Sequence, residues 1–255
     1  MPTSSAKMFP RFYCTEAMQA DHVIELPINT RHHTTRVLRL KQGNIITLFN
    51  GKGGEFLAQI EHISKSRTTV KINKFCEIER ESPLNIELAQ AICANEKMDW
   101  IIQKSVEFGI NYIQPVTTKR SIVRLSPERA SKRHHHWQQI AIAACEQCGR
   151  NRIPTVLPLK PLPDWLNNKK TNKTPQQHYF LLSTTATESI KNFPSLPANS
   201  KLTILVGPEG GLTPEEEATA LFAGFTSLRM GKRILRTESA ALATVAAMQT
   251  LWGDF

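Results

Sequence analysis

The order of apolar and polar positions divides the chain into two regions of different character. In the first region, short β-branched or alternating runs cover residues 45–50, 55–63 and 68–78, as expected for half-buried strands. The glycine-rich stretch at 50–54 is a strong hairpin signal between the first two runs. Residues 33–40, before them, have the spacing of one or two helical turns. The pattern predicts a small β-barrel domain over residues 1–79.

The second region, residues 80–255, alternates between apolar runs of strand length and longer segments with a helical period. Such alternation is typical of an α/β domain built on a parallel sheet. The expected strands cover residues 84–91, 112–116, 179–182, 202–206 and 225–228, and the expected helices cover residues 96–108, a segment capped by Ser126, 213–224 and 238–251. Residues 167–177, NNKKTNKTPQQ, are polar, and we expect a solvated loop there.

Composition restricts the class of protein and its compartment. With 255 residues, 40% of them hydrophobic and 21% charged, the chain is typical of a soluble globular protein. Its apolar runs are much shorter than the roughly 20 residues that a membrane span needs, and its first residues lack the apolar core of a signal peptide. The five cysteines are odd in number and scattered, unlike a disulfide framework. We therefore expect a cytoplasmic protein with no membrane partner.

Positive charge is concentrated in the first 160 residues. Residues 1–80 carry 12 Lys/Arg and 7 Asp/Glu, residues 81–160 carry 11 and 7, and residues 161–255 carry 9 and 8. This surplus predicts a polyanion-binding face, with nucleic acid as the first candidate. The alternative is a basic protein whose charge serves only solubility. The expected phosphate contacts are Arg11, Arg36, Arg39, Lys104, Arg150 and Arg152.

Two glycine-rich turns follow predicted strands in the second region. The first is LVGPEGGLTPEEE at residues 205–217, and the second is LRMGKRILRTESAA at residues 228–241. Both pass from a strand into a helix, and ligands of open α/β sheets bind at the carboxyl ends of strands. The two turns therefore predict one ligand site, unless they are only tight connections between strand and helix.

The chemistry of the first turn narrows the class of ligand. It has neither the Gly-Lys-Ser/Thr of a Walker loop nor a GxGxxG pattern. Glu209 and the glutamates at 215–217 would oppose a phosphate group at short range. Glycines would let backbone groups approach an adenine and a ribose closely. S-adenosylmethionine, which has a cationic sulfonium centre and no phosphate, is the first candidate.

Three further segments complete a resemblance to a known family. They are RVLRL at residues 36–40, EKMDWIIQKSVEFGI at 96–110 and IAIAACEQCGRNRIP at 140–154. Together with the two glycine turns, they resemble the bacterial 16S rRNA uridine-N3 methyltransferases of the SPOUT superfamily, over nearly the whole chain. Ser239 stands where threonine is more common in that family, and the hydroxyl is kept.

The resemblance implies a fold, a cofactor and partners. Residues 80–255 would form a SPOUT-type α/β domain with a parallel sheet and a deep trefoil knot, and residues 1–79 a PUA-like RNA-binding β-barrel. The enzyme would act as a homodimer on 16S rRNA, within the assembled small ribosomal subunit. Its S-adenosylmethionine pocket would contain, by position, Leu182, Ser183, Gly207, Pro208, Glu209, Gly210, Gly211, Leu228, Met230, Gly231, Ile234, Leu235 and Arg236.

Methylation of N3 requires the loss of its proton, because the neutral imide nitrogen is a poor nucleophile. We expect Arg236 to lie near the base and to offset the negative charge that develops on its oxygens. Glu209 or Glu238 would accept the proton, or would only pair with an arginine. The CxxC at 145–148 has no second pair, so we expect packing there and no metal. Ribose 2′-O-methylation within the same superfamily and a non-catalytic rRNA-binding assembly factor remain alternative functions.

Overall fold

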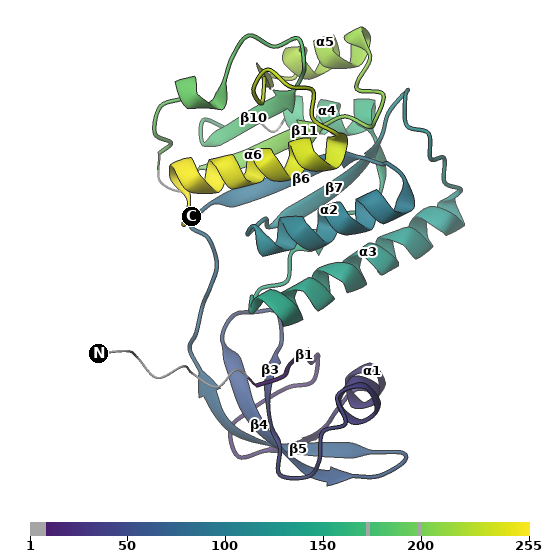
Figure 1. Cartoon of the computed structure of the whole chain (residues 1–255), viewed down its shortest axis with the longest axis vertical. Helices are drawn as coiled ribbons and strands as arrows, with labels where there is room; N and C mark the ends of the chain where they lie inside the picture. Colours follow the sequence, from purple (N-terminus) through teal and green to yellow (C-terminus); the bar gives the residue numbers. More distant parts are fainter. Residues whose placement is uncertain (1–8, 172–173, 198–199) are drawn as a thin grey trace. The chain divides into compact units, whose positions relative to one another are not determined.

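The computed structural model describes residues 9–171, 174–197 and 200–255 (Figure 1). The first eight residues of the predicted 1–79 domain therefore lie outside the described ranges. The chain forms two compact units, the first of which contains the chain up to Glu81 together with Cys145–Ile153. The second contains Ser82–Ala144 and Pro154–Phe255. Within the described ranges, no helix has both the length and the apolar character needed to cross a membrane.

The first unit is a small β domain. Its five strands have the order β1-β3-β4-β5-β2, with β1 and β3 parallel and the other neighbours antiparallel. Its elements are β1 (Arg11–Tyr13), β2 (Val23–Glu25), α1 (Ile28–His32), a π-helical turn (His33–Val37), β3 (Ile45–Phe49), β4 (Glu55–Ile63) and β5 (Thr68–Cys76). The expected β domain is confirmed. Among the described residues, however, β1 and β2 stay unpaired with each other, so the sheet is not a fully hydrogen-bonded barrel.

A cluster of charged and amide side chains connects residues 145–153 to the strands of the first unit. The Glu55 carboxylate accepts hydrogen bonds from Arg11 Nη1 at 2.5 Å and from Arg80 Nη1 at 3.0 Å. Asn151 donates to the same carboxylate at 3.3 Å and accepts from Arg11 at 2.7 Å. Burial acts to raise the pKa of Glu55, but the hydrogen bonds from the two arginines outweigh it and lower the pKa. Glu55 is therefore charged at neutral pH and holds this cluster together.

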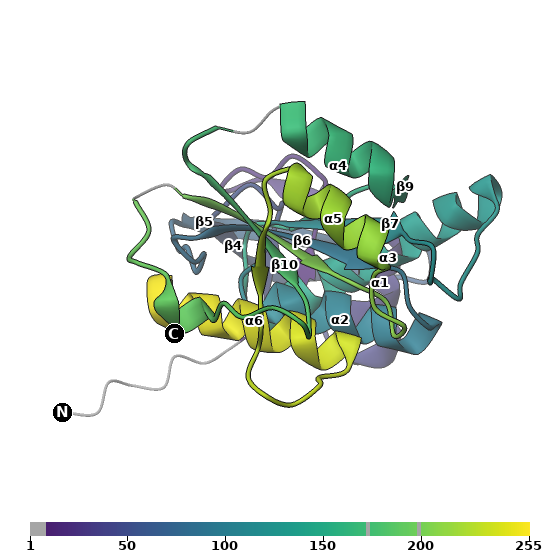
Figure 2. The ribbon, with the colours of Figure 1, turned by 90° about the horizontal axis from the view of Figure 1, so that it is seen from above.

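The second unit is a three-layer α/β domain. Its parallel strands have the order β12-β10-β11-β6-β7-β8, and β9 also pairs with β7. Helices α2 and α6 cover one face of the sheet, and α4 and α5 cover the other (Figure 2). The strands are β6 (Asn85–Ala91), β7 (Tyr112–Thr117), β8 (Thr155–Val156), β9 (Lys160–Pro161), β10 (Gln177–Leu182), β11 (Lys201–Val206) and β12 (Thr226–Leu228). The predicted α/β class is confirmed.

Helices connect the strands of the second unit, and one of them, α5, begins at a capping box. The helices are α2 (Asn95–Glu107), α3 (Pro127–Cys148, whose last four residues belong to the first unit), α4 (Leu162–Thr171), α5 (Pro214–Phe222), α6 (Thr237–Trp252) and a short 3-10 turn (Ile190–Asn192). Thr213 accepts a hydrogen bond from the backbone of Glu216, whose side chain accepts one from the backbone of Thr213. This capping box fixes the start of α5 beside the first glycine turn.

Helix α4 corrects the expectation of a loop over residues 167–177. The helix continues to Thr171, and residues 172–173 lie outside the described ranges. Trp165 is buried, and one turn later the Nζ of Lys169 lies 5.4 Å from the centroid of its indole ring. The loop prediction was wrong for the first five residues because a helix anchored by the buried Leu162, Trp165 and Leu166 continues through them as a polar last turn.

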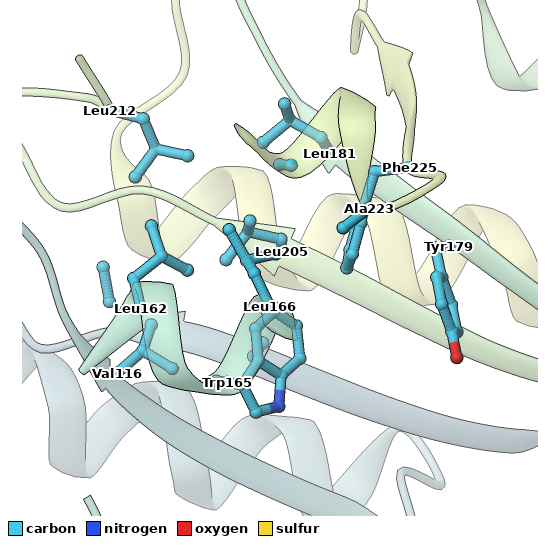
Figure 3. Close-up of a cluster of buried hydrophobic side chains, with 13 residues drawn as sticks. Val116, Leu162, Trp165, Leu166, Tyr179, Leu181, Leu205, Leu212, Ala223 and Phe225 are labelled. Atoms are coloured by element: carbon cyan, nitrogen blue, oxygen red, sulfur yellow. The ribbon is translucent and has the colours of Figure 1, made fainter. Parts of the chain in front are cut away.

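An aromatic core fills the layer between the sheet and helices α4 and α5. Trp165 of α4 and Tyr179 of β10 lie against Phe225, with ring centroids 5.7 and 5.0 Å from its own (Figure 3). Leu181 of β10 and Leu205 of β11, in the same cluster, are completely buried. This packing holds β10 and β11 in register close to the points where each strand ends.

Candidate active site

Three strands end at a cavity in the second unit. β10 ends at Leu182, β11 at Val206 and β12 at Leu228. Because these strands are parallel, their carboxyl ends lie at the same edge of the sheet. The residues that follow them surround a cavity of about 860 Å³, which is a usual size for a small-molecule site.

The cavity brings together the residues predicted as cofactor contacts. All thirteen of them line it: Leu182, Ser183, Gly207, Pro208, Glu209, Gly210, Gly211, Leu228, Met230, Gly231, Ile234, Leu235 and Arg236. Residues that line it without having been predicted include Lys97, Arg120, Thr185, Glu217, Arg229 and Thr237. The contact that each of the thirteen makes with a ligand stays a prediction.

The backbone of the first glycine turn is held by side chains from two other segments. Thr237 Oγ1, at the start of α6, donates a hydrogen bond to the carbonyl of Gly207 at 2.7 Å. Arg120 Nη1 donates to the carbonyls of Gly210 and Leu212 at 3.0 and 3.1 Å. Glycines alone would leave such a turn flexible, so these bonds help to fix its conformation.

Glu209 is held in the same turn through its side chain. Its Oε1 accepts hydrogen bonds from Lys97 Nζ at 3.0 Å and from the backbone nitrogen of Ala94 at 3.4 Å. Partial burial acts to raise the pKa of Glu209, but the hydrogen bond from Lys97 and the backbone hydrogen bonds outweigh it and lower the pKa. A carboxylate with a lowered pKa is a weaker base. Glu238, the other predicted proton acceptor, does not line the cavity, and its buried Oε2 has no hydrogen-bond partner among the described residues.

The second glycine turn carries positive charge to the cavity. Gly231 has φ +76°, a conformation that favours glycine, and its carbonyl accepts a hydrogen bond from Arg229 Nε at 2.9 Å. Ile234 lines the cavity but is 83% exposed, so it lies at the mouth. Ser183 and Glu217 also line the cavity, and the Ser183 hydroxyl donates a hydrogen bond to Glu217 Oε2 at 3.2 Å.

The charge of the cavity differs from the expectation drawn from its glutamates. Six basic side chains line it, against the carboxylates of Glu209 and Glu217. Glu215 is exposed and pairs with Lys119, and Glu216 is buried in the capping box. Of the four glutamates predicted to oppose a phosphate here, Glu209 and Glu217 line the cavity and the other two do not.

Two of the predicted phosphate contacts are buried in the first unit. The side chain of Arg11 is 9% exposed and is bound to Glu55. The side chain of Arg150 is 5% exposed and pairs with Glu81. This burial argues against direct phosphate contact by either arginine and gives both a structural role.

The other four predicted phosphate contacts are accessible to different degrees. Arg36 and Arg39 are exposed. The side chain of Arg152 is 57% exposed although it pairs with Glu79, and that of Lys104 is 34% exposed although it pairs with a glutamate on the same helix. All four retain surface that a phosphate could reach.

The CxxC at the end of α3 has the properties of a packed segment. All five cysteines of the chain are free thiols. Burial raises the pKa of Cys145 to about 12, which keeps the thiol protonated at neutral pH. Redox-active CxxC motifs instead lower the pKa of a cysteine.

Comparison with known proteins places the chain in a family. A family model described as an RNA methyltransferase domain matches residues 80–249, and one described as an RNA methyltransferase PUA domain matches residues 29–73. The ribosomal RNA small subunit methyltransferase E of Buchnera aphidicola subsp. Acyrthosiphon pisum is 36% identical over the full length of both chains. The Bacillus subtilis protein of the same name is 31% identical over 85% of this chain and 86% of its own.

Solved structures extend the comparison to the whole fold. The small subunit methyltransferase E of Neisseria gonorrhoeae, bound to S-adenosylmethionine, is 41% identical, with a TM-score of 0.89 over 97% of this chain and 99% of that one. A Legionella pneumophila structure with the same bound cofactor is 36% identical, with a TM-score of 0.90 over 97% and 99%. The chain therefore belongs to the family of ribosomal RNA small subunit methyltransferases E.

Proposed function

We propose that the chain uses S-adenosylmethionine to methylate N3 of a specific uridine in the 16S rRNA of the small ribosomal subunit. The observation that carries the proposal is the cavity in which all thirteen residues predicted for the cofactor meet. Membership of the family supports it, since the Neisseria and Legionella relatives hold S-adenosylmethionine. The names of the curated relatives support small-subunit ribosomal RNA as the substrate.

The lining of the cavity suits this cofactor. Leu182, Leu228 and Met230 offer apolar surface for an adenine ring. A Cβ at Gly207 would come within 3.1 Å of the Leu212 backbone nitrogen, so the turn closes tightly only around glycine. The Glu217 carboxylate offers an acceptor for hydroxyl or ammonium groups. When bound, S-adenosylmethionine supplies an already activated methyl group.

The protein then has to orient the base, balance its negative charge and accept the N3 proton. Arg236 lines the cavity at the N-cap of α6, where its guanidinium can offset charge on the base oxygens. The predicted proton acceptors remain Glu238, in the first turn of the same helix but outside the cavity lining, and Glu209, which lines the cavity. Glu209 is a poorer acceptor because it is already paired with Lys97.

We further propose that residues 1–79 bind RNA and that residues 80–255 carry out methylation. The PUA match over residues 29–73 and the exposed Arg36 and Arg39 support the first role. Arg152 and Lys104 are the other proposed phosphate contacts. The resemblance supports a cytoplasmic homodimer with a deep trefoil knot that acts on the assembled small subunit.

Calorimetric titration with S-adenosylmethionine tests the cofactor site. Wild type and Gly210→Ala are expected to bind, because a Cβ at Gly210 meets the Arg120 side chain at an ordinary 3.5 Å. The Gly210→Trp variant is expected not to bind the cofactor, because its indole ring must occupy part of the cavity that Gly210 and Arg120 line. Failure of the folded wild type to bind, or equal binding by the tryptophan variant, would refute the site.

Mass spectrometry of nucleosides tests the reaction. After incubation with the cofactor and small subunits or free 16S rRNA, 3-methyluridine is the expected product. A 2′-O-methylated nucleoside would instead identify a ribose methyltransferase. Cofactor binding with no methylation of either substrate would favour an assembly factor.

A further inference from the structure

Glu209 occupies an unusual place in the cavity, since it is the only charged residue within the glycine turn at 207–211. Its carboxylate does not point freely toward a ligand, because Oε1 accepts hydrogen bonds from Lys97 Nζ and from the backbone of Ala94. Both partners lie at the beginning of α2, more than one hundred residues earlier in the chain. The side chain of Glu209 therefore connects the glycine turn, which follows β11, to the start of α2, which follows β6.

The ion pair between Lys97 and Glu209 is partly shielded from solvent. The Lys97 side chain is 33% exposed and that of Glu209 is 25% exposed. A pair that is partly removed from water keeps more of its electrostatic attraction than a fully exposed one, because screening by solvent is weaker. Both residues also line the cavity, so a change in the pair acts directly on the ligand site.

The other bonds to the turn hold its backbone, and the Gly211 nitrogen also donates to the Pro208 carbonyl at 2.9 Å, which closes a β-turn around Glu209 and Gly210. Thr237 holds the carbonyl of Gly207, and Arg120 holds those of Gly210 and Leu212. Glu209 lies between these two points of attachment. Pro208 and the β-turn already restrain the peptide groups beside Glu209, so the bond to α2 acts on the position of the whole turn relative to that helix.

We infer that Lys97 is a positioning residue which, through Glu209, holds the glycine turn in the position that accepts the cofactor, and that Glu209 is a tether and not the proton acceptor. This inference rests on the proposed function. The charge of Lys97 compensates a carboxylate that would otherwise be left partly buried, and its helix provides the fixed point. The pair acts on cofactor affinity, and the chemical step depends on other residues.

Cofactor affinity measured by calorimetry tests the tether. Lys97→Met and Glu209→Gln are each expected to raise the Kd for S-adenosylmethionine about fivefold to tenfold, as for the loss of one partly exposed charge-assisted hydrogen bond. The double variant should be no worse than either single one, and Lys97→Arg should restore most of the affinity. The matched control is Lys169→Met, which removes a less exposed ion pair with Glu87 in the same unit. It should lower Tm at least as much and leave the Kd unchanged.

The pH profile and the methylation rate separate a tether from a merely structural residue and from a proton acceptor. In wild type the affinity should fall on acidification as Glu209 is protonated and the pair with Lys97 is lost, whereas in Lys97→Met it should change little with pH because the pair is already absent. With saturating cofactor, Glu209→Gln should methylate within about twofold of the wild-type rate, whereas loss of a general base costs about 100-fold or more.

Three results would overturn the inference. They are a Kd for Lys97→Met equal to that of wild type, additive effects in the double variant, and a rate of Glu209→Gln that stays at least 100-fold low with saturating cofactor. Failure of the proposed function gives a different result, because wild type itself would then bind no S-adenosylmethionine or methylate no RNA.

Discussion

Gly207 offers a sharp test of how tightly the first glycine turn must close. A Cβ at this position would lie 3.1 Å from the Leu212 backbone nitrogen, 3.2 Å from the Gly211 carbonyl carbon and 3.3 Å from the Gly211 Cα. All three neighbours are backbone atoms, so relief requires movement of the turn itself by a few tenths of an ångström. Overpacking of this kind costs about 1–3 kcal/mol.

Part of that cost should appear as lost cofactor affinity. If about 1.4 kcal/mol is relieved by opening the turn and must be restored for binding, the Kd for S-adenosylmethionine rises about tenfold in Gly207→Ala. The Tm should fall by roughly 2–4 °C for each kcal/mol of destabilisation of a chain of this size. Calorimetric titration and a thermal melt of the same sample measure both effects.

The matched control for Gly207→Ala lies in the same turn. Gly210→Ala makes the same chemical change, but its Cβ meets the Arg120 side chain at 3.5 and 3.6 Å, which is ordinary contact. Affinity should therefore fall in the first variant and not in the second. Equal Kd values for the two alanine variants would refute the reasoning, since clearance would then have no bearing on the site.

Three further predictions concern other parts of the molecule. Burial raises the pKa of Cys93 and of Cys145 to about 12, so peptide mass spectrometry after iodoacetamide treatment of the folded protein at pH 8 should find both unmodified. Arg11→Ala should destabilise the first unit by about 2–3 kcal/mol in urea unfolding, because it leaves a buried carboxylate with fewer donors. Arg36→Gln and Arg39→Gln should each weaken RNA binding and lower the slope of log K against log salt by about 0.7–0.9, with Tm unchanged.

Controls and contrary outcomes differ among these three. Rapid alkylation of either buried thiol in the native state would contradict the cysteine prediction. For the arginine cluster, Arg152→Ala should cost less than about 1 kcal/mol, because its ion pair is exposed, and an equal cost for both variants would contradict the assignment. Loss of affinity without a change in salt dependence would remove Arg36 and Arg39 from the phosphate contacts.

The lowered pKa of Glu55 predicts how the arginine cluster responds to acid. A carboxylate whose pKa is lower in the folded than in the unfolded state stabilises the fold above the unfolded value, and this contribution is lost as the pH falls through the folded value. Glu55→Gln should therefore reduce the dependence of stability on pH below 4.5, the ordinary pKa of a glutamate from which that of Glu55 is lowered. Urea unfolding between pH 3 and 7 checks it, and identical pH profiles for the variant and wild type would contradict it.

The sequence carried good information wherever a feature is local. Glycines with positive φ, such as Gly211 and Gly231, cannot easily be replaced, and apolar periods mark the strands beside them. Because parallel strands end at one edge of a sheet, two local turns were enough to predict a shared cavity. The capping residue Thr213 was visible in the same way, since its partner lies three residues along the chain.

Features that depend on distant partners were beyond local patterns. Lys97 and Arg120 have no unusual neighbours in the sequence, and only folding brings them to a turn about 90 to 112 residues away. Arg11 and Arg150 were predicted to contact phosphate because they are basic, yet long-range pairing buries both. Charge counts record how many arginines a region has, and not which carboxylates they meet. The deep knot stays a prediction, because it too depends on segments that are far apart in the sequence and leaves no local pattern.

The discontinuous first unit has a consequence for biosynthesis. Asn151 and its neighbours, which complete the hydrogen bonds around Glu55, are separated from the rest of that unit by 63 residues, 82–144. A ribosome adding roughly 5–20 residues per second needs roughly 4–14 s to extend the nascent chain from Glu81 to Ile153. During that interval Glu55 and Arg11 have already emerged from synthesis while their amide partner does not yet exist. The first unit therefore cannot be completed from residues up to Glu81 alone, because its last segment follows 63 residues of the second unit, and a fragment that stops at Glu81 would remain in that unfinished state.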